Sequence, residues 1–175
     1  PRLEKNKTDK AVLTIHKLKT SYYTIIYPMA IGALLGGASQ ALIKHFEVFG
    51  ENLGIAFQIQ DDILGVFGDE KQLGKSVTSD IEEGKNTLLI TFAFKHASLK
   101  QKKILDKYYG KGRVDESTHD LIKKVFEETG SLDYSKKQAI KYVEKAKRVI
   151  PYITQDSSMR ELLEQFSDFL ISRQK

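Results

Sequence analysis

The residues of this sequence best able to do chemistry are two adjacent carboxylates in an apolar run. Asp61 and Asp62 lie in the stretch 57–69, where no Lys or Arg stands three or four residues from either acid. Burying a carboxylate is costly unless a positive group compensates it. A hard divalent cation would do so, because Mg²⁺ prefers carboxylate oxygens and keeps waters that bridge to phosphate. The alternative is a solvent-exposed acid pair, and the two residues alone do not decide between these interpretations.

Lysines are the second chemical feature. Lys75 and Lys85 each follow a glycine in the polar stretch after the acids, and Lys19-Thr20 stands at the start of a long uncharged run. Together with Mg²⁺, such lysines can neutralise a diphosphate as its charge builds up on departure. Each of them is also explained as a solvated surface or helix-end lysine. Only the position of Lys75 and Lys85 beside the acid pair favours phosphate binding.

The elements that position these residues are all expected to be helices, because apolar residues recur at helical spacing and strict two-residue alternation is absent. On the helix that carries the acids, Gln58, Asp61, Asp62 and Gly65 share one face. We expect a first helix from Lys10, capped by Asp9, to about Lys44, with a kink or split at Pro28. A second helix is expected from Glu47 to about Phe67, closed by Gly68, and a loop follows over Asp69–Lys85. Helix is expected to resume at about Asn86, and three amphipathic helices are expected around Leu121–Phe126, Ile140–Ile150 and Leu162–Leu170.

The run Thr20–Ile43 carries no charge over 24 residues, which is long enough to span a bilayer. Its polar residues, its glycines and Pro28 argue against a span, and a helix that is apolar nearly all round can equally be buried in a large helical core. We therefore expect a buried helix and no membrane span. A membrane-embedded helical protein is the alternative, and extraction without detergent would exclude it.

The composition is that of an ordinary globular chain: 175 residues, 41% apolar, 29% charged, without cysteine. The net charge of +5 arises in residues 95–113, which hold seven basic residues against Asp106. No nucleic-acid motif accompanies them, so a solvated helix face followed by a loop is the preferred interpretation and no nucleic-acid partner is expected.

Without an internal repeat or a linker, residues 1–175 are expected to form part of a single domain. Because the chain starts at Pro1 rather than Met, we expect that it begins within a longer protein.

The run FQIQDDILGVFGDEKQLGK, followed by SDIEEGKNTLLI, resembles the second aspartate-rich motif of the trans-isoprenyl diphosphate synthases. The upstream segment HKLKTSYYTIIYPMAIGALLGG is similar to the Lys-Thr helix of that family, and EETGSLDYSKKQAIKYVEKAKRVI resembles its later helices. The resemblance covers nearly the whole chain and identifies it as the C-terminal part of such a synthase. It implies an all-α bundle around an apolar cavity, with the N-terminal helices missing.

The resemblance also implies roles for individual residues. Asp61 and Asp62 match Mg²⁺ ligands. Lys19, Lys75 and Lys85 match lysines that hold an allylic diphosphate, whereas Thr20 and Gln58 match residues near the carbon that becomes positive. The implied reaction condenses an allylic prenyl diphosphate with isopentenyl diphosphate, in a cytoplasmic enzyme that is a homodimer when complete. Asp69 and Asp80 match further acids of the family.

Two departures from the family pattern stand out. Gly65 occupies the position of the third aspartate of the motif, and Asp69 is a possible substitute for it. The first aspartate-rich motif of the family is absent, since Asp61-Asp62 is the only adjacent Asp pair. We therefore expect this polypeptide alone to be catalytically incompetent. A non-catalytic partner subunit and a terpene cyclase are the alternative functions; the upstream reading frame would test the first, and product analysis without isopentenyl diphosphate the second.

Overall fold

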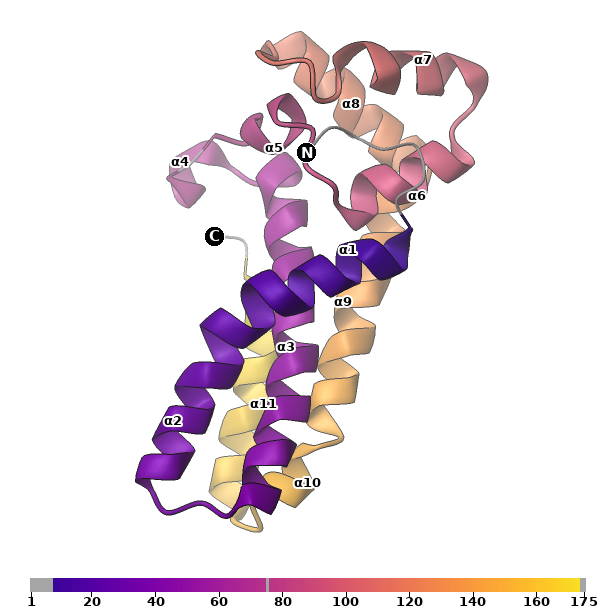
Figure 1. Cartoon of the computed structure of the whole chain (residues 1–175). Coiled ribbons are helices and arrows are strands. Elements are labelled where there is room, and N and C mark those ends of the chain that lie inside the picture. Colours follow the sequence, from indigo (N-terminus) through magenta and orange to yellow (C-terminus); the bar gives the residue numbers. More distant parts are fainter. Residues whose placement is uncertain (1–7, 75, 174–175) are drawn as a thin grey trace. The chain divides into compact units, whose positions relative to one another are not determined.

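The computed structural model describes residues 8–74 and 76–173, and every regular element within them is a helix, which confirms the predicted all-α class (Figure 1). The helices are α1 (Asp9–His16), the π-helix η1 (Lys17–Ile26), α2 (Tyr27–Leu35), α3 (Gln40–Phe67), α4 (Glu70–Leu73), α5 (Ser79–Glu82), α6 (Leu88–His96), α7 (Leu99–Tyr108), α8 (Glu116–Glu128), α9 (Ser131–Lys147), α10 (Ile150–Ile153) and α11 (Ser157–Ser172).

The first predicted helix consists of three segments that follow one another directly. It begins at Asp9, and the hydroxyl of Thr8 accepts the N–H of Ala11 at 3.4 Å, so Thr8 lies at the N-cap position predicted for Asp9. Pro28 lies in the first turn of α2, and the helix changes from π to α one residue before it. Because Ile26 and Tyr27 both have αR backbone angles, this is a change of helix type rather than a break in the helix. The predicted end near Lys44 is wrong, because the chain leaves the helix after Leu35 at two consecutive glycines.

The helix that carries the acids is longer than predicted. α3 begins at Gln40 rather than Glu47. At this start, the hydroxyl of Ser39 accepts the N–H of Leu42 at 3.2 Å. It ends at Phe67, as predicted, and Gly68 follows. The predicted loop after it contains the one-turn helices α4 and α5. α6 then begins at Leu88, capped by the side chain of Thr87.

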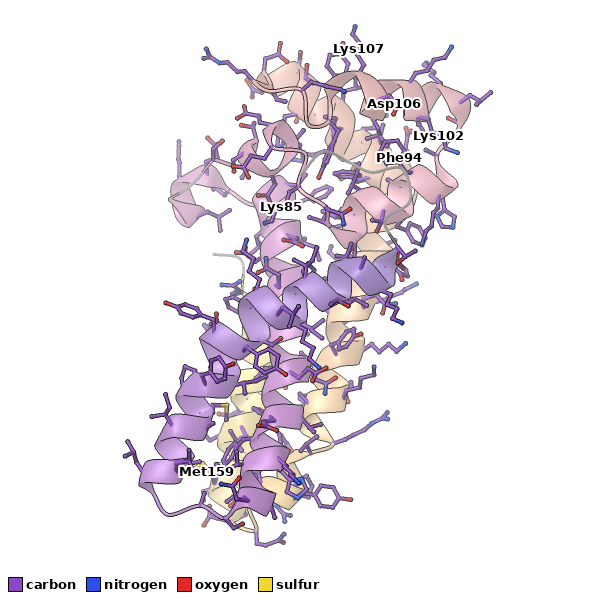
Figure 2. All side chains as sticks on the ribbon, in the orientation of Figure 1. Lys85, Phe94, Lys102, Asp106, Lys107 and Met159 are labelled. Carbon is purple, nitrogen blue, oxygen red and sulfur yellow. The ribbon has the colours of Figure 1, made fainter. Side chains whose placement is uncertain are left out.

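The basic segment 95–113 covers the end of α6, the whole of α7 and the following loop. Six of its seven basic side chains are exposed and Lys102 is half-buried, which confirms the predicted solvated helix face. Figure 2 shows Lys102 and Lys107 on α7, the helix that a Ser98–Gln101 capping box begins. The charge excess is therefore a property of one surface element.

The chain divides into two compact units. The first unit comprises the described residues 8–12, 61–74 and 76–137, and the second comprises residues 13–60 and 138–173. The helices α1, α3 and α9 each cross this division, and α3 contributes Val66 to the core of the first unit and Leu53 to that of the second. The predictions of a single domain and of an apolar cavity stay predictions.

In the first unit, α6 and α7 pack on α8 around a buried apolar core (Figure 1). Phe126 on α8, Leu105 on α7 and Ile90 on α6 are fully buried there. Val66, near the end of α3, belongs to the same core. The C-terminal turns of the acid-bearing helix are thereby held against this helical layer.

In the second unit, α3, η1, α9, α10 and α11 share a separate core that includes Phe49, Leu53 and Ile150. Two glycines bring α3 very close to η1: an added Cβ on Gly50 would lie 2.9 Å from Cγ1 of Ile26, and one on Gly54 would lie 2.5 Å from Oγ of Ser21. Only a residue without a side chain permits this approach.

The buried residues of η1 recur at a spacing of five, with Thr20 and Ile25 in one row and Ser21 and Ile26 in the next. That spacing suits the i→i+5 hydrogen bonds of a π-helix rather than an α-helix.

The prediction of a buried uncharged helix is wrong for α2, none of whose residues is buried. α2 packs against the core through Met29, whereas Ile31, Leu34 and Leu35 are exposed. Within the described residues, no helix has both the length and the apolarity needed to cross a bilayer.

Candidate active site

A largely buried ionic cluster lies within the first unit. The Lys85 Nζ is 3.0 Å from Oδ1 of Asp62 on α3 and 3.0 Å from Oδ2 of Asp80 on α5. The Asp62 side chain is 3% exposed, and that of Lys85 is 27% exposed. Figure 2 shows Lys85 beside the C-terminal part of α3. A lysine brought in from 23 positions downstream therefore compensates the buried carboxylate.

The two carboxylates of this cluster stabilise the positive charge of Lys85. Burial lowers the pKa of Lys85, but the negative charges of Asp62 and Asp80 and their hydrogen bonds outweigh that effect, so that its pKa is raised. Lys85 consequently carries its positive charge at every physiological pH. An ammonium ion has three N–H donors, so one donor remains beyond those directed at Asp62 and Asp80.

Asp80 also explains the glycine in the acid motif. A Cβ at Gly65 would lie 2.5 Å from Oδ2 of Asp80, so the carboxylate of Asp80 fills the space where a side chain at position 65 would begin. Asp69, the substitute considered from the sequence, is exposed at the N-cap of α4, where its Oδ1 accepts the N–H of Lys71 at 2.9 Å. A carboxylate from α5 therefore lies at the position that a third motif aspartate would occupy.

The two motif acids have different surroundings. Asp62 is buried with a residue exposure of 2%, whereas Asp61 is half-buried. The difference in burial follows from their adjacency on a helix, because consecutive side chains point about 100° apart. Asp62 is thus engaged by Lys85, and Asp61 is the more accessible of the two to a ligand.

The second unit holds a neutral polar pair. The Thr20 hydroxyl on η1 donates to Oε1 of Gln58 on α3, and both residues are buried. The neighbouring Ser21 hydroxyl donates to the carbonyl of Glu51 at 3.0 Å. Lys19, next to Thr20, is exposed. The structure therefore brings Thr20 to Gln58, and it brings Lys85 to Asp62, each within its own unit.

Two predictions need a separate remark. Lys75 lies outside the described residues. Asp80, taken from the sequence only as a secondary candidate, belongs to the ionic cluster, because the turn of α5 directs its carboxylate toward α3. Asp80 precedes Lys85 by five residues in a stretch that was predicted to be a loop. Helical periodicity therefore gave no indication that Asp80 and Lys85 form a pair.

The acidic residues suit a magnesium ion only as a partial ligand set. Within residues 8–74 and 76–173, no three His, Asp or Glu side chains are grouped so that they could hold a metal ion. Mg²⁺ is commonly bound through one or two carboxylates, with waters and substrate phosphates completing an octahedron. Asp61 and Asp62 supply two carboxylates. They therefore fit a metal ion that also binds a phosphate ligand, rather than a metal ion whose ligands all come from the protein.

Sequence comparison relates most of this chain to known proteins. The family model described as polyprenyl synthetase matches residues 2–129. The geranylgeranyl diphosphate synthase of Methanosarcina mazei is 36% identical over 172 residues, which are 97% of this chain and 50% of the relative. That of Sulfolobus acidocaldarius is 41% identical over 154 residues, or 83% of this chain and 44% of the relative. The chain spans about half the length of the curated relatives it matches.

Solved structures extend the similarity to nearly the whole of this chain. The geranylgeranyl pyrophosphate synthase of Corynebacterium glutamicum, complexed with isoprenyl diphosphate and magnesium, matches with a TM-score of 0.89 and 27% identity, over 97% of this chain and 48% of that chain. A polyprenyl synthase of Caulobacter crescentus, complexed with calcium and isoprenyl diphosphate, matches with a TM-score of 0.89 and 28% identity, over 98% of this chain and 52% of that one. Because the family model spans residues 2–129 and the Methanosarcina mazei relative is 36% identical over 97% of this chain, the chain belongs to the polyprenyl synthetase family.

Proposed function

We propose that this chain is the C-terminal half of a trans-polyprenyl diphosphate synthase, which joins an allylic prenyl diphosphate to isopentenyl diphosphate. The observation that carries the proposal is the Asp62–Lys85–Asp80 cluster, which holds an ammonium ion between Asp62 on α3 and Asp80 on α5. The bound isoprenyl diphosphate and divalent metals of the similar structures support it. The complete enzyme is proposed to be cytoplasmic and homodimeric.

In this proposal the ammonium groups of Lys85, Lys75 and Lys19 bind diphosphate oxygens. Mg²⁺ held by Asp61 and Asp62 would supply further positive charge to the same diphosphate. When the allylic C–O bond breaks, both electrons leave on the diphosphate oxygen, where the lysines stabilise the new negative charge. The double bond of isopentenyl diphosphate then supplies the electrons of the new C–C bond, and a proton is lost to the departed pyrophosphate.

Thr20 and Gln58 have a different role in the proposal. Their side chains are neutral, so near an allylic carbon they offer oxygen dipoles that stabilise positive charge without capturing it as a carboxylate would. The buried Thr20–Gln58 hydrogen bond supports this role because it holds both groups in one orientation. Apolar helices would exclude water, which otherwise converts the allylic cation to an alcohol.

Binding by the 175-residue chain provides the first test. Titration calorimetry with inorganic pyrophosphate in the presence of Mg²⁺ should detect a complex that weakens at least about tenfold in Asp61→Ala and in Lys85→Ala. The matched control is Lys107→Ala, which removes an exposed lysine of α7 and should bind as the wild type does. Equal affinity in all three variants would refute the proposed site.

Turnover provides the second test. The chain should be joined to the N-terminal half of the Methanosarcina mazei relative and supplied with both diphosphates and Mg²⁺, and chain extension should appear. Thr20→Val should lower kcat more than it changes KM, because the proposed dipole acts on charge that develops only in the transition state. Products formed from the allylic diphosphate alone would favour the terpene cyclase alternative instead.

A further inference from the structure

The backbone around Lys85 is held by a loop that lies outside the acid and lysine motifs. This segment, residues 109–114, joins α7 to α8 and is called here the α7–α8 loop. The Tyr109 hydroxyl donates to the carbonyl of Lys85 at 2.6 Å, and the N–H of Gly110 donates to the carbonyl of Ile81 at 2.8 Å. The N–H of Val114 donates to Oε1 of Glu82 at 3.0 Å. The loop therefore contacts the Lys85 segment along most of its length.

Lys85 is anchored at both of its backbone polar groups. Its N–H donates to the carbonyl of Asp80 at 2.9 Å, and its carbonyl accepts from Tyr109. Lys85 itself lies between α5 and α6 and belongs to neither helix. Because no helical ladder holds this residue, these two bonds determine where its side chain starts and therefore how Nζ reaches Asp62.

A glycine pair brings the two segments together. A Cβ on Gly84 would lie 2.7 Å from the Cα of Gly110, and a Cβ on Gly110 would lie 3.0 Å from the Cα of Gly84. Both glycines have a positive φ, of 66° and 71°. The contact is between backbones, so a side chain on either residue could be accommodated only if the segments separated.

Tyr109 is itself rigidly placed. Its side chain belongs to the core of the first unit and meets the ring of Phe126 edge-on, with the ring centroids 6.3 Å apart. Burial, and then the negative charges of Asp80 and Asp62, raise the pKa of Tyr109, so its hydroxyl remains a hydrogen-bond donor. A fixed phenol is therefore directed at the carbonyl of Lys85 from the helical core.

We propose that Tyr109 and Gly110 are positioning residues, which hold the Lys85 backbone so that its ammonium ion lies between Asp62 and Asp80. The consequence for diphosphate binding rests on the proposed function; the placement of Lys85 does not. Tyr109→Phe tests the hydrogen bond with little change in packing, and Gly110→Ala tests the backbone contact. Gly130→Ala is the matched control, because Gly130 also has a positive φ, of 73°, a Cβ there would meet nothing within 4 Å, and its N–H donates to the carbonyl of Glu127 in α8.

The first measurement needs no ligand. In nuclear magnetic resonance spectra of the 175-residue chain, scalar couplings across the hydrogen bonds from Lys85 Nζ to the carboxylate carbons of Asp62 and Asp80 report the placement directly. These couplings should weaken or disappear in Tyr109→Phe and Gly110→Ala and persist in Gly130→Ala. Undiminished couplings in Tyr109→Phe, in a folded protein, would overturn the proposal.

The second measurement is a double-mutant cycle on binding of pyrophosphate with Mg²⁺. Tyr109→Phe should weaken binding about three- to tenfold in the wild-type background and leave it unchanged in a Lys85→Met background, because Tyr109 acts only through Lys85. Equal losses in both backgrounds would show a general structural effect and contradict the proposal. If the wild type does not bind pyrophosphate, the proposed function fails, and the couplings still decide whether Tyr109 positions Lys85.

Discussion

The two units of the chain bury polar groups in different ways. The first unit buries an ionic cluster, in which Lys85 lies 3.0 Å from both Asp62 and Asp80. The second unit buries a neutral pair, in which Thr20 donates to Gln58. Removing one member of an ionic cluster leaves a charge without compensation, whereas removing one member of a neutral pair loses a single hydrogen bond. The first arrangement is therefore the more sensitive to substitution.

Both units use glycine to bring their polar groups together. In the first unit, Gly65 leaves room for the carboxylate of Asp80, and in the second, Gly54 lets α3 approach Ser21. In the first case a flexible side chain fills the space, and in the second the contact includes backbone. The second unit should therefore tolerate a larger residue at its glycine less well than the first.

The largest expected effect is on the ionic cluster. Lys85→Met should lower the free energy of unfolding by about 3 kcal/mol at pH 7, because the buried Asp62 loses its cation. Urea denaturation followed by circular dichroism measures this change. The double variant Asp62→Asn/Lys85→Met should recover part of the loss. A loss below about 1 kcal/mol would mean that the cluster behaves as an exposed ion pair.

Gly54→Ala is expected to lower the free energy of unfolding by about 1–3 kcal/mol, because its Cβ would collide with Ser21 across the contact between α3 and η1. Gly32→Ala is the matched control within the second unit. Gly32 lies in α2 with nothing within 4 Å of an added Cβ, so this variant should gain up to about 1 kcal/mol from helix propensity. Equal shifts in the two urea midpoints would contradict the close approach of the helices.

A smaller effect is expected for the neutral pair. Thr20→Val keeps the shape of the side chain and removes the hydroxyl that donates to Gln58, so it should cost about 1 kcal/mol of unfolding free energy. Thr24→Val, at an exposed position of the same π-helix, should change stability by less than about 0.5 kcal/mol. If Thr20→Val cost as much as Lys85→Met, the contrast between ionic and neutral burial would be lost.

The smallest effect concerns pH in the first unit. His119 is buried with its Nε2 3.0 Å from the carbonyl of Val66, and burial lowers its pKa below 6.5. The unfolded chain therefore binds a proton more readily than the folded chain. The stability that the neutral ring contributes is present above pH 6.5 and is lost as pH falls through the lower folded-state value.

His119→Gln should remove this dependence. Between pH 7.5 and pH 5.5 the unfolding free energy of the wild type should fall more steeply than that of the variant, as measured by urea titration at each pH. Parallel pH profiles would show that His119 does not titrate differently in the folded and unfolded states.

Local pattern was sufficient for much of the helical content. The end of α3 at Phe67 was predicted from Gly68, which follows an apolar run. The start of α3 was missed, because its cap at Ser39 lies within a run that was interpreted as one helix. The π-helix was also missed, because its row spacing becomes apparent only when the buried face is known.

By itself the sequence determined the all-α class, the acid pair and the lysines that could accompany it, because these follow from residue type and short spacing. Only the tertiary structure decided that Lys85 compensates Asp62 and that Asp80 fills the space beside Gly65. It also decided that Tyr109 holds the carbonyl of Lys85. These pairs are separated by loops whose course no helical periodicity records, and their contacts form only when the helices pack.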